Sequence, residues 1–177
     1  MTVDIVDLRQ RPQHADAVAE RIWKAFWRRH GTPFATIRDG LQGILRAEAD
    51  VPFAVVAEID GQPCGNALVI DNDEPARPDL GPWVAAVWVD EDRRGRGIAR
   101  ALIDDAVRRC TALGVPRVYL ASQPALRDFY VGLGWRVLES DVGQHRLVLY
   151  ARELDAVPSP SCEESPMDLT FGKEELA

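Results

Sequence analysis

Long apolar runs are absent from the sequence, since none reaches the ~18 residues that a membrane-spanning helix requires. The N-terminal segment MTVDIVDLRQ also lacks the basic start and the apolar core of a secretion signal. These two absences predict that the protein has no membrane partner, and they favour the cytoplasm as its location.

Cysteine and histidine are scarce, with three of each among 177 residues. Cys64, Cys110 and Cys162 form no CxxC pattern, and no histidine has a cysteine or a carboxylate at metal-ligand spacing. The sequence therefore predicts no metal site. It predicts reduced thiols, with Cys110 on the buried face of a helix, as in proteins of a reducing compartment.

An excess of basic charge is also missing. The sequence has 21 Lys and Arg against 28 Asp and Glu, which gives a formal net charge of −7. A dedicated nucleic-acid-binding protein is more often basic, so we expect no nucleic-acid partner. One local exception is the segment 93–100, which holds four of the basic residues.

Apolar periodicity indicates the order of the secondary structure elements. Residues 15–29, a segment around 37–45 and residues 98–113 have apolar side chains at helical spacing, and a short fourth helix begins near Pro124. Alternating or β-rich segments predict strands at 2–8, 53–59, 64–70, 83–89, 118–121, 135–139 and 146–154. This order predicts an α/β (α+β) fold.

The domain boundary follows from a change in composition near the end of the chain. Residues 1–155 hold all of the predicted elements and are expected to form one domain. Residues 156–177 contain three prolines, three serines and several acids, which is typical of a loosely ordered tail. The segment MDLTF within that tail has the apolar residues needed to dock on the domain.

The segment RRGRGIA at 93–99 lies between an apolar strand and an amphipathic helix. Gly95 and Gly97 lack a Cβ and allow a tight turn, and the N–H groups at a helix N-terminus form an anion site. A dinucleotide motif does not fit, because Arg100 stands at its third glycine, and the Gly-Lys-Ser/Thr of a phosphate-binding NTPase loop is absent. An arginine–glycine RNA-binding segment should be disordered. A solvated basic face with ordinary turn glycines remains the alternative.

The longer segment WVAAVWVDEDRRGRGIARALI resembles the acetyl-CoA-binding segment of the GNAT acetyltransferase superfamily. The family's signature Gln/Arg-x-x-Gly-x-Gly/Ala matches Arg94 to Ala99, after a strand that ends in valine and a short acidic turn. The later segment FYVGLGW is similar to the end of the family's fourth helix. The resemblance implies a GNAT-like fold: a mixed, mostly antiparallel seven-stranded sheet, splayed between strands four and five, with four helices.

The resemblance also implies an N-acetyltransferase that transfers the acetyl group of acetyl-CoA to a primary amine by direct attack. Tyr130 matches the residue that usually protonates the departing thiolate. A β-bulge or splay near Val87 is expected, because an amide of the fourth strand must be free to polarise the acetyl carbonyl. The implied acetyl-CoA-binding residues are Val87, Trp88, Val89, Arg94, Gly95, Arg96, Gly97, Ile98, Ala99, Arg100 and Gln123.

The sequence departs from the family pattern on the fourth strand, where 83–89 has no carboxylate to act as a general base. The candidates in the acidic loop 71–79 are Asp71, Asp73, Glu74 and Asp79, and a water relay is the alternative. Gln123 stands where the family often has an asparagine. The missing carboxylate supports one other function, a non-catalytic acyl-CoA-binding module.

The acceptor is left open as a small-molecule or peptide amine, and a homodimer is also left open. The family's acceptor pocket implies roles for Trp23, Trp27, Phe34 and Trp83. For Trp23 and Trp27 we expect core positions, because large aromatic residues usually dominate cores. The acidic loop 71–79 favours a positively charged acceptor, such as a polyamine-like amine, an aminosugar or a protein N-terminus.

Overall fold

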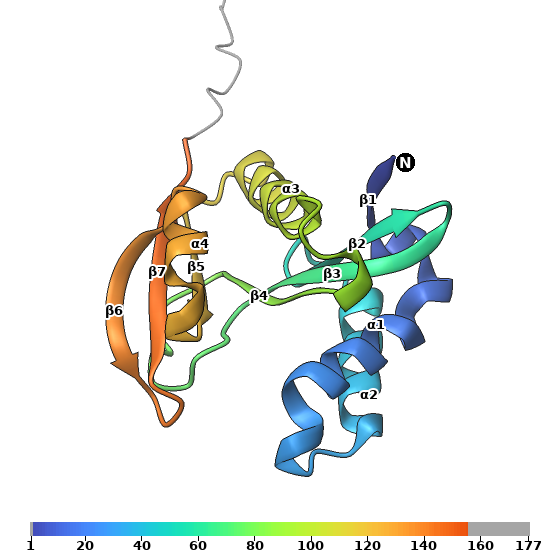
Figure 1. Ribbon diagram of the computed structural model, residues 1–177, viewed down its shortest axis with the longest axis horizontal. Coiled ribbons are helices and arrows are strands. Elements are labelled where there is room, and N and C mark those ends of the chain that lie inside the picture. Colours follow the sequence, from blue (N-terminus) through green and yellow to red (C-terminus); the bar gives the residue numbers. More distant parts are fainter. Residues whose placement is uncertain (1, 156–177) are drawn as a thin grey trace, which may run out of the picture.

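A mixed seven-stranded sheet in the order β1-β2-β3-β4-β5-β7-β6 forms the centre of the computed structural model, which describes residues 2–155 (Figure 1). The strands are β1 (Val3–Asp7), β2 (Phe53–Ile59), β3 (Gln62–Ile70), β4 (Trp83–Val89), β5 (Arg117–Ser122), β6 (Arg136–Val142) and β7 (Leu147–Glu153). All neighbours are antiparallel except β4 and β5, which are parallel. The predicted mixed, mostly antiparallel sheet is confirmed.

Four α-helices flank the sheet within the described residues: α1 (Ala15–Ile22), α2 (Phe34–Arg46), α3 (Ile98–Ala112) and α4 (Arg127–Gly132). Helices α1 and α2 pack against one face of β2 and β3 in a single apolar cluster. Helices α3 and α4 share a second cluster on the opposite face, which runs from β2 to β7 (Figure 1). The sheet is therefore the middle layer between two pairs of helices.

Strand β2 shows how the sequence produces these layers. All seven of its residues are buried, and successive side chains of a strand point to opposite faces. Val55 and Ala57 enter the α3–α4 cluster, whereas Ala54 and Val56 enter the α1–α2 cluster. A central strand covered on both faces is accordingly apolar at nearly every position.

The two cysteines that the structure describes are core residues, as predicted for Cys110. Cys110 on α3 is fully buried, and burial raises the pKa of its thiol to about 11. Cys64 on β3 is also buried, and its Sγ donates to the Ala57 carbonyl. Cys162 and the predicted tail 156–177 lie outside the described residues.

The first predicted helix, 15–29, is not one regular helix. Helix α1 ends at Ile22, and the chain continues as a π-helical turn, Trp23–Trp27, and a 3-10 turn, Arg28–His30. A π-helical turn is wider than an α-helical one, so the residues beyond it leave the face defined before it. The expectation that Trp27 is a core residue is wrong, because 46% of it is exposed.

No helix of the chain between residues 2 and 155 is both long enough and apolar enough to cross a membrane.

Candidate active site

Strands β4 and β5 separate almost as soon as they begin. Their single paired position is Trp83 with Tyr119, where the Tyr119 N–H donates to the Pro82 carbonyl at 3.0 Å. Beyond this pair β4 stays hydrogen-bonded to β3, while β5 pairs with β7. Figure 1 shows β4 and β5 running in different directions. The predicted splay is confirmed, and it leaves one side of β4 without a partner strand in the described chain.

A β-bulge interrupts β4 beside the splay. Asn66 of β3 pairs with Trp88 and Leu68 pairs with Ala85, so Ala86 and Val87 together oppose one residue of β3. Ala86 has a φ of 49°, a left-handed conformation that is uncommon for a residue with a side chain. The expected bulge near Val87 is therefore present, and it turns main-chain groups of β4 out of the ladder.

The glycine turn follows β4 and begins α3. Gly97 is the N-cap residue of α3, with a φ of 78°, and no side chain caps the helix. A Cβ built at Gly95 or Gly97 would meet no atom within 4 Å, so open space lies in front of both. The first N–H groups of a helix have no intrahelical partner and attract anions. The turn therefore has the geometry of a phosphate cradle.

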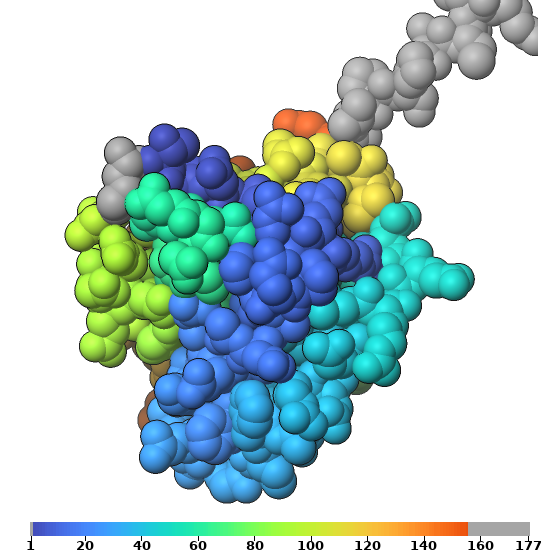
Figure 2. All heavy atoms as spheres, turned by 90° about the vertical axis from the view of Figure 1, so that its right-hand side faces the viewer, coloured from blue at the N-terminus to red at the C-terminus, as the bar shows by residue number. Residues whose placement is uncertain are grey.

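The other residues of this turn divide between core and surface. Ile98 is buried in the α3–α4 cluster, so only its main chain faces the turn, and Ala99 is half-buried. Arg94, Arg96 and Arg100 are exposed. Figure 2 shows the yellow-green segment that includes the turn on the surface, near the β2–β3 connection.

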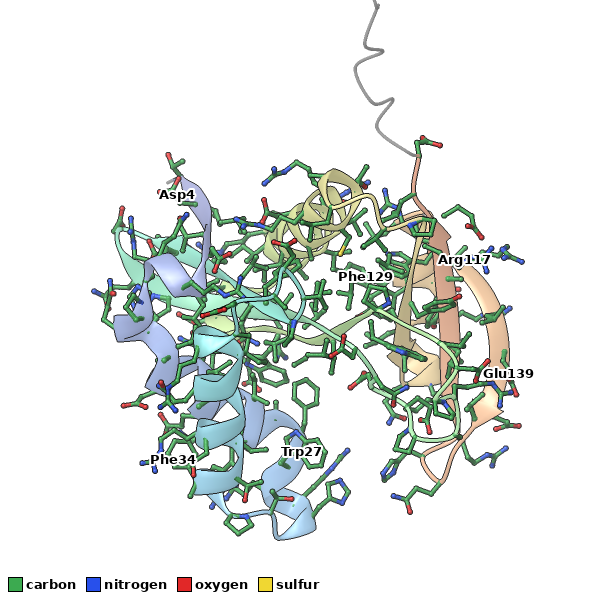
Figure 3. All side chains as sticks on the ribbon, turned by 180° about the vertical axis from the view of Figure 1, so that it is seen from behind. Asp4, Trp27, Phe34, Arg117, Phe129 and Glu139 are labelled. Atoms are coloured by element: carbon green, nitrogen blue, oxygen red, sulfur yellow. The ribbon has the colours of Figure 1, made fainter. Side chains whose placement is uncertain are left out.

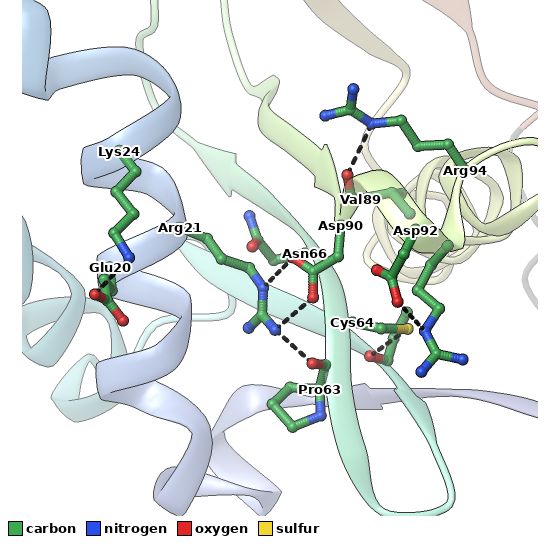
Figure 4. Close-up of polar contacts among 12 residues, drawn as sticks. Glu20, Arg21, Lys24, Pro63, Cys64, Asn66, Val89, Asp90, Asp92 and Arg94 are labelled. Atoms are coloured by element: carbon green, nitrogen blue, oxygen red, sulfur yellow. Dashed lines mark hydrogen bonds and ion pairs between the residues drawn. The ribbon is translucent and has the colours of Figure 1, made fainter.

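The arginines of the turn have only local partners. Arg94 donates from Nε to the Val89 carbonyl at 3.0 Å (Figure 4). Its guanidinium lies 4.6 Å from the centre of the Trp88 ring. Arg96 donates to the Asp92 carbonyl, and Arg100 lies 3.7 Å from the Asp104 carboxylate. These contacts at the surface are weak, so the guanidinium groups remain available to an anion.

Close packing brings α3 down onto β3 and β4 at the site. A Cβ at Gly65 of β3 would meet the Trp88 carbonyl at 2.8 Å and the Leu102 side chain at 3.2 Å. Only glycine permits this approach. The start of α3 is thereby fixed beside the bulged part of β4.

Tyr130 lies on α4 between two aromatic neighbours. Its ring centre is 5.1 Å from Phe129 and 5.3 Å from Tyr150, and the residue is 5% exposed. Burial, and secondly the nearby Tyr150, raise the pKa of its phenol to about 12. The Tyr150 hydroxyl accepts a hydrogen bond from Ser122, whereas the Tyr130 hydroxyl has no such partner in residues 2–155. The Tyr130 phenol is therefore protonated at neutral pH, and its O–H group is available to donate a hydrogen bond.

Gln123 directly follows β5 and is exposed at the N-cap of the turn Pro124–Leu126, where its side chain makes no capping bond. It flanks the splay on the side opposite β4. Its predicted contact with acetyl-CoA remains a prediction.

The four carboxylates of the acidic loop 71–79 have different environments. Glu74 is buried, accepts from the Ala76 N–H at 3.0 Å and lies against Gly143 of the β6–β7 turn. Asp71 and Asp79 line a cavity of about 440 Å³ at the start of β4. Asp73 is exposed as a residue, and neighbouring protein atoms partly desolvate its carboxyl group. This desolvation, and secondly the charge of Glu74, raise its pKa to about 6.

The helical region of α1 and α2 holds three of the aromatic residues implied for the acceptor pocket: Trp23, Trp27 and Phe34. Trp23 is half-buried and donates to the Thr32 carbonyl, with Phe34 at its edge. Figure 3 shows Trp27 on the side of this region that faces the β5–β7 half of the sheet. Trp83 is fully buried and donates to the Leu80 carbonyl, so it is a core residue.

Sequence reasoning missed one contact across the two halves of the molecule. The rings of His30 and His145 lie 5.4 Å apart, which joins the end of the first helical region to the β6–β7 turn. No local pattern links residues so distant in the sequence. Their proximity follows only from the assembled sheet.

The comparison with protein families agrees with this geometry. The family model described as the acetyltransferase (GNAT) family matches residues 16–135. The chain belongs to the GNAT family. No curated protein sequence matches the chain.

Solved structures with the same fold are distant in sequence. They include a protein described as a GNAT-family acetyltransferase from Desulfovibrio desulfuricans, with a TM-score of 0.66 and 18% identity over 86% of this chain and 99% of that one. An acyl-CoA N-acyltransferase from Pseudomonas aeruginosa has a TM-score of 0.61 and 20% identity over 85% and 99%. An aminoglycoside 6'-acetyltransferase type Ii has a TM-score of 0.65 and 17% identity over 90% and 100%. At these identities the likeness establishes the GNAT fold alone.

Proposed function

We propose that this GNAT protein is an N-acetyltransferase that moves the acetyl group of acetyl-CoA to a primary amine. The observation that carries the proposal is the splay of β4 from β5, with the glycine turn after β4 and with Tyr130 in one apolar cluster with Val87 of β4. An unpaired strand edge, an anion cradle and a hydrogen-bond donor are what a long, phosphate-bearing thioester requires.

The cradle of Arg94 to Arg100 would hold the pyrophosphate of acetyl-CoA through main-chain N–H groups. Arg94, Arg96 and Arg100 would add positive charge around it. The main chain of Val87 to Val89 would pair with the pantetheine arm as an added strand does. Gln123 would meet the same arm from the β5 side.

The chemistry is a direct displacement at the thioester carbonyl. The amine nitrogen forms a bond to the carbonyl carbon, the carbon–sulfur bond breaks, and the amine loses a proton as the thiolate gains one. A phenol with a pKa of about 12 remains protonated at neutral pH. Tyr130 would therefore stabilise the departing thiolate chiefly by donating a hydrogen bond.

The attacking amine must pass its proton to a general base, and β4 has no carboxylate to act as one. Asp73 has a pKa of about 6, close to the value that suits a general base at neutral pH. We propose that a carboxylate of the loop 71–79 takes this role, directly or through water, and Asp73 is the first to test. The negative charge of this loop also favours an amine substrate that arrives as a cation.

An acetylation screen tests the proposal. Purified protein and acetyl-CoA are incubated with polyamines, aminosugars and peptides with free N-termini, and CoA release and acetylated product are measured. Product from at least one class supports the proposal. Acetyl-CoA binding by calorimetry without product from any class would contradict it and favour the non-catalytic acyl-CoA-binding module.

A further inference from the structure

Asn66 is a fully buried polar residue in a part of β3 that is otherwise apolar. Its Nδ2 donates a hydrogen bond of 2.8 Å to the main-chain carbonyl of Ala86, and its Oδ1 has no partner among residues 2–155. Burying an amide with an unpaired oxygen is unfavourable, and an aliphatic side chain of similar size avoids that cost. The asparagine is therefore explained by the group to which its Nδ2 donates.

The group that Asn66 binds is part of the bulge. Ala86 has left the regular ladder with β3 and has a φ of 49°. A bulged carbonyl that is buried needs a hydrogen-bond donor from elsewhere. Asn66 supplies that donor from the neighbouring strand and so fixes the orientation of the peptide that joins Ala86 to Val87.

This peptide directs the N–H group of Val87 away from Asn66. Asn66 lies two residues before Leu68, which packs in the α1–α2 cluster, so both point to that face of β3. In a planar trans peptide the carbonyl of Ala86 and the N–H of Val87 point in opposite directions. The Val87 N–H is therefore directed away from Asn66 and from the Ala86 carbonyl that Asn66 binds, and the Val87 side chain packs in the cluster that contains Tyr130.

We propose that Asn66 is a positioning residue that holds the Ala86–Val87 peptide so that the Val87 N–H donates to the acetyl carbonyl oxygen of bound acetyl-CoA. The proposal rests on the proposed acetyltransferase function. The negative charge that develops on this oxygen during attack is stabilised by a donor that is already oriented, and Asn66 makes it so.

Infrared spectroscopy of bound acetyl-CoA tests this arrangement directly. Acetyl-CoA labelled with ¹³C at the carbonyl is bound to the wild type and to Asn66→Leu, which has similar volume and no donor. We expect the wild type to lower the carbonyl stretching frequency relative to free acetyl-CoA, and we expect Asn66→Leu to lose most of that shift. A folded Asn66→Leu variant with the wild-type frequency would overturn the proposal.

Turnover gives a second readout with a matched control. Removing one oxyanion-hole donor costs ~10²–10³ in kcat, so misplacing one should cost at least about tenfold, with acetyl-CoA affinity changed much less. Leu68→Ala on the same face of β3 should lower the melting temperature and leave the carbonyl frequency as in the wild type. Equal loss of the shift in both variants would show a general packing effect and overturn the proposal.

Two further outcomes separate this inference from the proposed function. Asn66→Ser, whose hydroxyl is too short to reach the Ala86 carbonyl, replaces Asn66→Leu if the leucine variant does not fold. If neither variant folds, Asn66 is a folding residue and the positioning role is refuted. If wild-type protein does not bind acetyl-CoA, the proposed function fails, whereas a wild-type shift that survives in a folded Asn66→Ser refutes only the role of Asn66.

Discussion

Strands β2 and β4 are both seven-residue apolar segments in the middle of the same sheet. Strand β2 is hydrogen-bonded along both edges, to β1 and β3, and every residue in it is buried. Strand β4 is paired along one edge, meets β5 at a single position, and is only half-buried from Ala86 to Trp88.

The difference between these strands is that β4 lacks main-chain pairing, and therefore stability, at the candidate active site. Unpaired N–H and C=O groups inside a sheet are unfavourable, and β2 has a partner strand on each side. In β4 the bulge and the splay free such groups beside an anion cradle. Changes near β4 should therefore affect acetyl-CoA and catalysis, whereas changes in β2 should affect stability alone.

The largest expected effect lies at the cradle that follows β4. Gly97→Asp places a carboxylate in the open space in front of the turn. Like charges brought together cost several kcal/mol, so acetyl-CoA affinity measured by calorimetry should fall at least about 100-fold.

Gly114→Asp is the matched control for this change. Gly114 ends the same helix with a φ of 73° and equally open space, so it reproduces the conformational strain away from the cradle. We expect near-wild-type affinity for this variant. Equal loss of binding in both variants would show that the cradle does not hold the pyrophosphate.

The next effect concerns the donor beside β4. Tyr130→Phe removes one oxygen that has no hydrogen-bond partner in the described chain, so the melting temperature should change little. General acid catalysis contributes ~10²–10⁴ in rate, so kcat should fall at least about tenfold with acetyl-CoA affinity retained.

Tyr150→Phe provides the contrast, because its hydroxyl accepts from Ser122 and is fully buried. This variant should lose about 1 kcal/mol of stability and keep its turnover. Wild-type kcat in a folded Tyr130→Phe protein would remove Tyr130 from the mechanism.

Two valines make the comparison of β2 with β4 directly measurable. Val55→Ala in β2 removes two methyl groups from a fully buried position and should lower the free energy of unfolding by about 2–3 kcal/mol. Val87→Ala in β4 should cost less, because Val87 is half-buried. Denaturant titration of both variants decides this, and a larger loss at Val87 would mean that the splayed strand is as tightly packed as β2.

The sequence predicted the strands and the glycine turn because each has a local signal. Strands 53–59 and 83–89 are apolar segments of strand length, and Gly95 and Gly97 lie between a strand and a helix. The resemblance to the GNAT family then indicated that β4 and β5 diverge. The structure reproduces the bounds of β2 and β4 and places both glycines at positive φ.

Other features depend on tertiary contacts and had no local signal. Helical spacing continues through Trp23 to Trp27 in the sequence, so nothing there predicts the π-helical turn that exposes Trp27. Asn66 in β3 gains its partner only when Ala86 is displaced by the bulge. The four carboxylates of loop 71–79 could not be ranked until their burial and neighbours were known.

The smallest expected effect concerns the carboxylate that β4 lacks and the preceding loop provides. Asp73 has a pKa raised from 3.8 to about 6 by desolvation, so its charged form is disfavoured in the folded protein. The cost to stability is fully present above pH 6 and disappears as the pH falls below the unfolded-state pKa of about 4. Asp73→Asn should therefore raise the melting temperature slightly at pH 7.5, and this gain should shrink toward pH 4.

If Asp73 accepts the amine proton, wild-type kcat/KM should fall about tenfold per pH unit below pH 6, and Asp73→Asn should lower kcat at pH 7.5. Higher stability with unchanged kcat would assign the proton to a water relay instead.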